Sequence, residues 1–317
     1  MSGEEFDVID RYFARIGWQS GQVDLGPGDD CALLRVPEQH QLCVSTDTLI
    51  SGVHYPEGST GDVVAHRSAV ANLSDLSAMG AQPLGFLIAL TLPEVDHPWL
   101  RAFSDRIARL SDQYRIPLVG GNMSRGKLSV TITVMGAVPV GDALTRQGAK
   151  PGDGVFATGY LGEAAAGLLA TNKNDMVQDA LISAYCFPQA RLDFGQRIRD
   201  TASACIDISD GLLADAGHLA ESSGVGVCIQ TGQLFVSEAL GGYLGEEPSI
   251  DMILHGGDDY ELCFSAPLHK QDVLAAFAAE SETPLSLIGE VVTDPGLWLC
   301  DRDGTRKQAS VRGYQHF

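Results

Sequence analysis

Four segments of the chain place carboxylates beside hydroxyl, amide or glycine residues. They are Gly28-Asp-Asp30, Ser45-Thr-Asp47, Asn72-Leu-Ser-Asp75 and Asp207-Ile-Ser-Asp210. Hard divalent cations such as Mg²⁺ prefer carboxylate, hydroxyl and carbonyl oxygens, and these segments offer little else. A compact group of carboxylates without a cation would repel itself and raise its own pKa values. Together the four segments favour a divalent-metal site.

Each carboxylate taken alone also has an ordinary structural explanation. Asp30 fits an Asx turn, Asp210 fits the cap of a helix that begins near Gly211, and Asp47 fits a loop. Asp75 is the sharpest case, because it lies about one turn before the end of a predicted helix, where the helix dipole disfavours an anion. A nearby cation would remove that conflict.

The segment Gly121–Leu128 imitates a phosphate-binding loop but departs from it in two ways. The pattern G-x-x-x-x-G-K-[ST] needs a hydroxyl at position 128, where this chain has leucine. The loop must also lead into a helix, whereas residues 128–135 alternate as a strand does. We interpret the segment as a glycine-rich turn between strands, for which a plain hairpin is an equal alternative. Zincin, serine-hydrolase and dinucleotide-binding motifs are absent from the sequence.

The composition narrows the classes of partner. The chain has 317 residues, enough for two domains at about 150 residues each. With 21 Lys and Arg against 41 Asp and Glu, its formal net charge is −20, which repels nucleic acid and anionic membrane surfaces. A phosphorylated ligand needs a cation between itself and so acidic a protein. We therefore expect no nucleic-acid partner and no membrane partner.

The N-terminus and the cysteines predict a cytoplasmic protein. The first residues are acidic where a signal peptide is basic, and no apolar run approaches the roughly 18 to 20 residues of a membrane span. The seven cysteines are scattered and never have C-x-x-C spacing. We expect them to be reduced, mostly buried thiols.

Short β-branched runs alternate with amphipathic stretches, which predicts an α/β chain of the α+β type. A turn-rich stretch at 146–153 marks the predicted boundary, so residues 1–145 form a mixed sheet with helices and residues 146–317 an α+β domain. In the first domain we predict helices at 2–15, 61–79 (closed by Gly80) and up to Tyr114 (capped by Asp96), and strands at 42–46, 86–92, 116–119 and 128–135. In the second we predict a strand at 154–158, helices within 161–199, a strand ending at 207, a helix at 211–222, and strands near 227, 262 and 287–292.

Six motifs, in order along the chain, resemble those of the thiamine-monophosphate kinase family. They are Gly28-Asp-Asp-Cys-Ala-Leu33, Ser45-Thr-Asp-Thr-Leu-Ile-Ser-Gly-Val-His54, Ala71-Asn-Leu-Ser-Asp-Leu-Ser-Ala-Met-Gly-Ala81, Ala143-Leu-Thr-Arg146, Asp207-Ile-Ser-Asp-Gly-Leu212 and Gly256-Gly-Asp-Asp-Tyr-Glu-Leu262. The likeness runs from the N-terminal helix to the closing Gly313-Tyr-Gln-His-Phe317 and so covers nearly the whole chain. It also places the chain in the superfamily of aminoimidazole-ribonucleotide synthetase and selenophosphate synthetase, whose members use ATP without a Walker loop.

The resemblance implies ATP-dependent phosphorylation of thiamine monophosphate to thiamine diphosphate, with several Mg²⁺ ions bridging the ATP phosphates to the substrate phosphate. It implies no general base, since a phosphate nucleophile is already ionised near neutral pH. The implied metal ligands are Asp30, Ser45 through its backbone carbonyl, Thr46, Asp47, Asp75, Asn122, Asp207 and Asp210. The implied ATP contacts are Gly121, Asn122, Arg146 and Ser209, and the implied contacts of thiamine monophosphate are His54, Asp258 and Tyr314. The resemblance further implies a homodimer joined through strands of the N-terminal sheets.

Two positions depart from the family pattern. Asn122 replaces the usual Asp and removes a charge from the implied metal site, and Asp258 replaces the usual Glu with a shorter reach. We expect an active enzyme with a raised magnesium requirement. The alternatives are another ATP-using member of the superfamily or an inactive module that binds nucleotide or thiamine phosphate. For His54 and Tyr314, an ordinary surface residue and a packing anchor also remain open.

Overall fold

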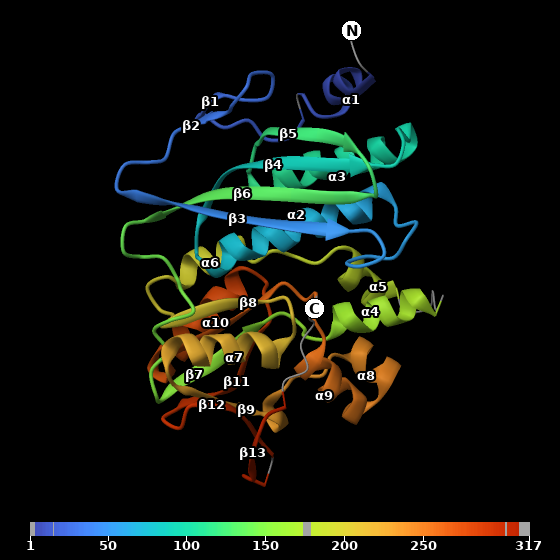
Figure 1. Ribbon diagram of the computed structural model, residues 1–317. Helices are drawn as coiled ribbons and strands as arrows, with labels where there is room; N and C mark the ends of the chain where they lie inside the picture. The colour runs from blue at the N-terminus through green and yellow to red at the C-terminus, as the bar shows by residue number, and fades with distance from the viewer. Residues whose placement is uncertain (1–3, 15, 174–178, 302, 311–317) are drawn as a thin grey trace. The chain divides into compact units, whose positions relative to one another are not determined.

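The computed structural model describes residues 4–14, 16–173, 179–301 and 303–310 (Figure 1). The chain forms two compact units. The first runs up to Leu76 and resumes over Ala81–Gly141, and the second takes Ser77–Gly80 and the chain from Asp142 onward. The α+β fold class is confirmed, while the metal, ATP and dimerisation roles of the predicted domains stay predictions.

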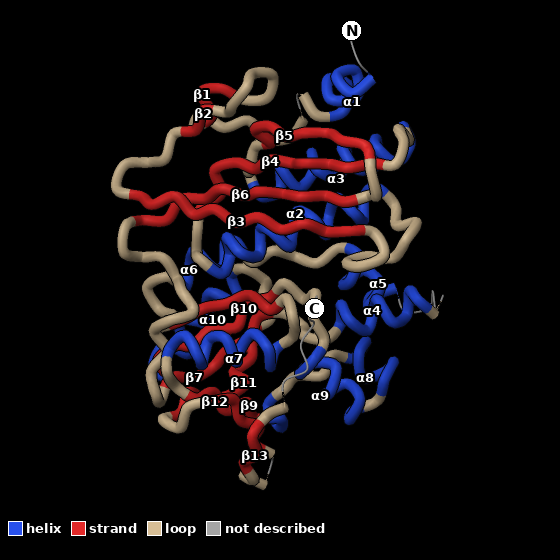
Figure 2. Tube along the Cα trace, viewed as in Figure 1, coloured by secondary structure: helices blue, strands red, loops and turns tan. Residues whose placement is uncertain are grey.

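The first unit is built on a four-stranded sheet of order β3-β6-β4-β5. Its strands are β3 (His40–Ile50), β4 (Gln82–Leu92), β5 (Leu118–Arg125) and β6 (Ser129–Pro139), and only β4 and β5 pair in parallel. The helices α2 (Gly61–Ala78) and α3 (His97–Tyr114) cover one face of this sheet (Figure 2). The short helix α1 (Glu4–Tyr12) and the two-stranded sheet of β1 (Val23–Leu25) and β2 (Leu33–Leu34) precede it.

Local signals account for both long helices of this unit. Gly80 has a φ of 63° and ends α2 in the left-handed conformation that glycine tolerates, as predicted. The Asp96 side chain accepts the Trp99 N–H and caps α3, also as predicted.

All four strand predictions of this unit were too short, and two of these errors concern site residues. The strand predicted at 42–46 continues to Ile50, so Ser45, Thr46 and Asp47 lie within β3 and not at its end. The glycine-rich turn predicted at Gly121–Leu128 is wrong up to Arg125, because those residues belong to β5. The hairpin alternative is also wrong, because β4 separates β5 from β6. A Cβ at Gly121 would collide with the Ile88 carbonyl oxygen, so glycine here allows two strands to approach closely.

The second unit contains a seven-stranded sheet of order β13-β12-β9-β11-β7-β10-β8. The strands are β7 (Asp153–Thr158), β8 (Ala204–Ile208), β9 (Gly226–Gln230), β10 (Glu261–Pro267), β11 (Leu285–Val292), β12 (Gly296–Cys300) and β13 (Arg306–Gln308). All neighbours pair antiparallel except β9 and β12. The predicted strands of this domain are confirmed, but β12 and β13 were not predicted.

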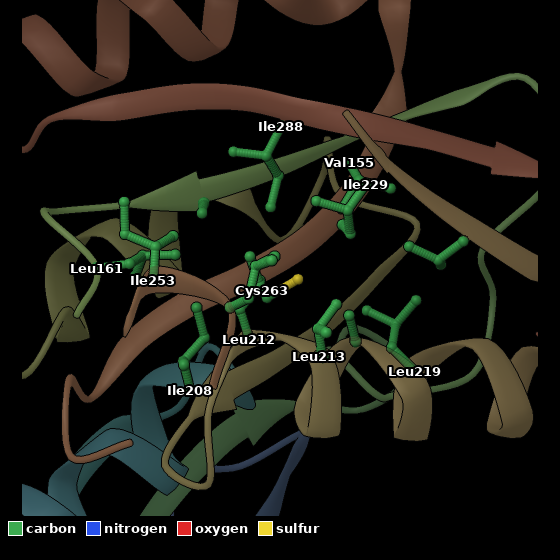
Figure 3. Packing of buried hydrophobic residues seen from close by; sticks show 14 of the residues in the cluster. Val155, Leu161, Ile208, Leu212, Leu213, Leu219, Ile229, Ile253, Cys263 and Ile288 are labelled. Carbon is green, nitrogen blue, oxygen red and sulfur yellow. The ribbon is translucent and has the colours of Figure 1, made fainter. Parts of the chain in front are cut away.

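Helices cover both faces of this sheet. The face with Ile208 and Ile229 packs on α7 (Leu212–Ser223) through Leu212, Leu213 and Leu219 (Figure 3). The opposite face packs on α6 (Leu192–Ile198) and α10 (Gln271–Glu280). The remaining helical segments are α4 (Glu163–Asn172), α5 (Asp179–Cys186), η1 (Thr231–Gln233), α8 (Glu238–Leu244), α9 (Glu246–His255) and η2 (Leu268–Lys270). None of the helices in the described ranges is long and apolar enough to cross a membrane.

The cysteine prediction is wrong for one pair. Cys228 on β9 and Cys300 on β12 form a disulfide between neighbouring strands. Of the other five, Cys205 and Cys263 are buried, Cys43 and Cys186 are half-buried and Cys31 is exposed. The pair is separated by 72 residues, so its proximity follows from strand order and not from spacing in the sequence. A cytoplasmic location stays a prediction.

Candidate functional site

In the first unit, an oxygen-rich pair forms where β3 packs on α2. Side chains alternate between the faces of a strand, so Ser45 and Asp47 share the face that α2 covers. The Ser45 Oγ donates a hydrogen bond to Asp75 Oδ2 at 2.5 Å. The Asp47 N–H donates to Asn72 Oδ1 at 2.9 Å, which holds Asp47 one helical turn from Asp75. This brings together three of the predicted ligands.

Asn72 positions a predicted ligand, and the sequence analysis gave it no role of its own. Its side chain is fully buried, and its Nδ2 donates to the Ser68 carbonyl oxygen at 2.9 Å while its Oδ1 accepts from Asp47. A buried amide on the sheet-facing side of a helix was the signal that could have identified it. These two hydrogen bonds of Asn72 hold the backbone of Asp47 beside the half-buried Asp75 carboxylate.

The Ser45, Asp47 and Asp75 group fits a hard divalent cation by donor chemistry, since it offers two carboxylates and the Ser45 backbone carbonyl oxygen. Within the described part of the chain, however, no three His, Cys, Asp or Glu side chains lie close enough together to hold a metal by themselves. A cation here would therefore need further oxygens, and phosphate oxygens are the kind that Mg²⁺ commonly takes from a substrate.

Thr46 lies on the other face of the sheet. Its Oγ1 is 2.9 Å from Thr133 Oγ1 and donates to the Ile132 carbonyl oxygen at 3.1 Å. Because its hydroxyl points away from Asp75, a metal ligand at this position would have to be the backbone carbonyl oxygen.

Asn122 also lies away from the Asp47–Asp75 pair. Strand register places Asn122, Ala89, Thr131 and Thr48 in one row across the sheet, and paired residues share a face. Asn122 therefore lies on the face that α2 does not cover. It is three strand spacings, about 14 Å, from β3. The structure does not bring it to the cation that Asp47 and Asp75 would hold.

Two other predicted residues of this unit lie in loops. Asp30 is exposed, and its N–H donates to Asp29 Oδ1 at 2.8 Å, so Asp29 and not Asp30 accepts the turn hydrogen bond. His54 lies in the turn after β3, where its Nδ1 accepts the Ile50 N–H at 3.0 Å. With Nδ1 as an acceptor, the neutral ring carries its proton on Nε2. The fully buried Arg67 donates from Nη2 to the His54 carbonyl oxygen at 3.4 Å.

In the second unit, two predicted segments meet at one edge of the sheet. The Asp258 N–H donates to the Ser209 carbonyl oxygen at 2.9 Å, and the Tyr260 N–H donates to the Ile208 carbonyl oxygen at 2.8 Å. These bonds join the segment before β10 to the segment after β8. Asp207, Ser209, Asp210 and Asp258 therefore belong to one acidic edge, which is the second candidate group of site residues.

The backbone of the segment before β10 is strained. Asp258 and Tyr260 have φ values of 69° and 52°, in the left-handed region that side chains rarely adopt. Residues held in such conformations cluster at binding and catalytic sites because the surrounding fold must enforce them. The Tyr260 hydroxyl also donates to Asp258 Oδ1 at 3.1 Å, which orients the carboxylate.

Two buried carboxylates enforce this conformation. Asp259 Oδ2 accepts the Gly162 N–H at 2.8 Å and Oδ1 accepts the Ala164 N–H at 3.4 Å, both at the N-terminus of α4. Burial raises the pKa of Asp259 well above its usual range, against the lowering effect of these hydrogen bonds. Glu261 forms a bidentate pair with Arg191, in which Nε donates to Oε2 at 2.7 Å and Nη2 donates to Oε1 at 2.5 Å. The Thr158 hydroxyl donates a third hydrogen bond to Oε2.

Asp215, in the first turn of α7, supports the other half of the acidic edge. Its Oδ2 accepts the Ser209 N–H at 3.0 Å and the Asp210 N–H at 3.1 Å, and the residue is 3% exposed. Burial, together with the charge of Asp210, raises the pKa of Asp215 to about 7 despite these bonds. The sequence analysis missed this residue, although an acidic residue in a helix's first turn after the Asp207–Asp210 motif was a usable signal.

The last two predicted residues do not join these groups. The Arg146 carbonyl oxygen accepts from Ser223 Oγ at 2.9 Å, at the C-terminal end of α7. Ser209 precedes the N-terminal end of that helix, so the two backbones are separated by about the 18 Å length of its 12 residues. Tyr314 lies outside the described residues.

Known proteins and family models match this chain over most or all of its length. Models of the AIR synthase related protein match it, the N-terminal domain over residues 28–138 and the C-terminal domain over residues 150–299. The thiamine-monophosphate kinase of Escherichia coli (strain K12) is 42% identical, covering 100% of this chain and 99% of that protein. The crystal structure of thiamine-monophosphate kinase from Stenotrophomonas maltophilia K279a is 38% identical, with a TM-score of 0.85 and coverage of 94% and 95%. A structure of AaThiL complexed with AMPPCP and TMP is 31% identical, with a TM-score of 0.80 and coverage of 98% and 96%.

Proposed function

This chain belongs to the thiamine-monophosphate kinase family of AIR synthase related proteins, and we propose that it transfers the γ-phosphoryl group of ATP to thiamine monophosphate. The observation that carries the proposal is the full-length match at 42% identity, which leaves neither unit without a counterpart. The AaThiL complex with AMPPCP and TMP supports the same pair of substrates. The products are thiamine diphosphate and ADP.

The proposed reaction is a direct displacement. An oxygen of the substrate phosphate forms a bond to the γ-phosphorus, and the bond between that phosphorus and the bridging oxygen of ADP breaks. The attacking oxygen is already ionised near neutral pH, so no side chain has to remove a proton from it. Positioning of two anions and neutralisation of their charge are the main demands on the protein.

The oxygen-rich groups suit these demands. We propose Asp47 and Asp75, with the carbonyl oxygens of Ser45 and Thr46, as one set of Mg²⁺ ligands, and Asp207 and Asp210 as another, with Asp30 as a further ligand. Bound Mg²⁺ would neutralise the phosphates and the charge that develops on the leaving oxygen. Gly121, Asn122, Arg146 and Ser209 are the proposed ATP contacts.

The geometry supports two of the proposed substrate contacts. Asp258 is half-buried and oriented by Tyr260, which suits a fixed contact to the substrate. His54 Nδ1 accepts the Ile50 N–H, which fixes the orientation of the ring for the proposed contact to the substrate. Tyr314 remains a proposed ring contact.

We also propose that the protein is a homodimer joined through the sheet of the first unit. The face of β3 that α2 does not cover exposes Leu42 by 50% and Val44 by 59%, next to a row of threonine hydroxyls. Exposed aliphatic side chains on a sheet face are typical of an interface. Sedimentation of the purified chain would test this.

An ADP-release assay tests the function. We expect release that requires ATP, Mg²⁺ and thiamine monophosphate together. Asp75→Asn should lower kcat by at least about 100-fold, the effect of losing one charge-stabilising group, while Asp105→Asn on the exposed side of α3 should leave it unchanged. Release with aminoimidazole-ribonucleotide precursors in place of thiamine monophosphate would favour another superfamily member. Binding of both ligands without release would favour an inactive module.

A further inference from the structure

Two exposed aromatic rings contact each other in the second unit. Tyr160 is 44% exposed and Phe235 is 56% exposed, and their ring centroids are 5.5 Å apart with an interplanar angle of 30°. The two residues come from different loops, one after β7 and the other after η1. A pair of large aromatic side chains that pack on each other and remain open to solvent is a feature of ligand-binding surfaces.

Strand topology places this pair at the acidic edge. β10 pairs antiparallel with β7 and β8, and β11 pairs antiparallel with β7 and β9. The carboxyl ends of β7, β8 and β9 therefore lie at the same edge of the sheet, where β10 begins. Tyr160 follows β7 by two residues, and Asp258 precedes β10 by three. Their strands are neighbours, about 4.8 Å apart.

Hydrogen bonds fix both aromatic loops to the start of α4. The Gly162 N–H, two residues after Tyr160, donates to Asp259, which is the chain neighbour of Asp258. Ser237 Oγ, two residues after Phe235, donates to Glu163 Oε1. The loops that carry the two rings are thus held at one helix terminus, together with the loop that carries Asp258. The rings form a supported surface and not two independent side chains.

The chemistry of this surface selects a cationic aromatic ligand. The faces of Tyr and Phe rings attract cations and stack on heteroaromatic rings. The neighbouring Asp207, Asp210 and Asp258 add negative charge, whereas the guanidinium of Arg191 is paired with Glu261. A thiazolium ring is both cationic and aromatic, while the adenine of ATP is neutral.

We propose that Tyr160 and Phe235 form a stacking site for the thiazolium part of the phosphorylated substrate, an inference that rests on the proposed function. The pair selects the substrate by its ring cation, and Asp258 lies beside it at the same sheet edge. ATP makes no contact with these rings.

Kinetic constants of ring-removing variants test the site. Tyr160→Leu and Phe235→Leu should each raise KM for thiamine monophosphate by about 5- to 20-fold, the range for loss of a cation–π contact, with KM for ATP and kcat within twofold. Tyr160→Phe is the matched control, because it keeps the ring and should stay within twofold of the natural protein. Melting temperatures of all variants should agree, since both side chains are exposed.

Equilibrium binding separates this site from the kinase activity. Calorimetry without ATP would compare thiamine monophosphate with an isostere that has carbon in place of the quaternary nitrogen. The natural protein should prefer the cation by about 5-fold or more, and the Leu variants should lose that preference. Equal binding of the two compounds, or a rise in KM for ATP instead, would overturn the inference. An inactive natural protein that still shows the preference would overturn the proposed function alone.

Discussion

Replacement of Asp215 by asparagine gives the sharpest test of how the acidic edge is held. Asp215 is 3% exposed, and burial is the main cause that raises its pKa from an ordinary 3.8 to about 7. A carboxyl group whose pKa is raised by folding favours the folded state most below pH 3.8, where it is protonated in both the folded and the unfolded chain. This contribution to the free energy of unfolding is lost as the pH rises towards 7, because the unfolded chain ionises first. Asparagine cannot ionise, so the Asp215→Asn variant does not lose it.

The magnitude follows from the two pKa values. Between pH 5 and pH 8, ionisation of Asp215 should lower the free energy of unfolding of the natural protein by about 2 to 3 kcal/mol. This value takes 1.36 kcal/mol for each pKa unit between the unfolded and folded states. The same loss is absent from Asp215→Asn, which also keeps an oxygen for the Ser209 and Asp210 amides. Asp215→Ala removes that acceptor and should destabilise the fold at both pH values by about 2 to 6 kcal/mol, at 1 to 3 kcal/mol for each orphaned donor.

Urea unfolding in the presence of a chelator, at pH 5 and at pH 8, is the measurement. Glu221→Gln, an exposed carboxylate on the same helix, is the matched control and should follow the natural protein at both pH values. If the difference between Asp215→Asn and the natural protein is the same at pH 5 and pH 8, Asp215 is not a buried titrating carboxylate, and the reasoning fails.

Three further predictions concern other parts of the fold. Arg191→Met should destabilise the protein by about 3 to 5 kcal/mol by leaving Glu261 charged and buried, and adding Glu261→Met should recover most of this in urea unfolding; no recovery would contradict the pairing. Alkylation of the denatured protein without reductant should label five of the seven cysteines, and all seven after reduction, unless Cys228 and Cys300 are free thiols. Asn122→Asp should change the Mg²⁺ concentration for half-maximal rate by less than about twofold, because strand order places residue 122 about 14 Å from Asp47 and Asp75 and a charge at that distance in water contributes little. A large decrease would make residue 122 a ligand.

Elements with local signals could be predicted from the sequence. The Asp96 cap and the Gly80 terminator each act within one turn of the helix they bound, so their residue types are sufficient. The Ser45 to Asp47 and Asp207 to Asp210 motifs were found for the same reason, since their oxygen donors are adjacent in the chain.

Features that depend on distant neighbours could not be predicted. The strand at Gly121 requires the Ile88 carbonyl oxygen from another strand, and the disulfide requires β9 and β12 to be adjacent. The separation of Asn122 from Asp47 depends on the strand order β3-β6-β4-β5 and on which face each residue occupies. A one-residue change of register would reverse that face, and the sequence pattern of a half-exposed strand does not specify it.

The segment from Asp258 to Glu261 shows why position in the fold, and not residue type, decides function here. Asp258 and Asp259 are identical neighbours in the sequence, yet Asp259 is buried at the start of α4 and Asp258 is half-buried at the acidic edge. Two strained residues, each unfavourable by about 1 to 3 kcal/mol, alternate with the two anchors Asp259 and Glu261. Removing an anchor would release that strain and displace Asp258. Loss of activity in an Asp259 variant would therefore report on positioning, and only variants of Asp258 that keep the fold would report on substrate contact.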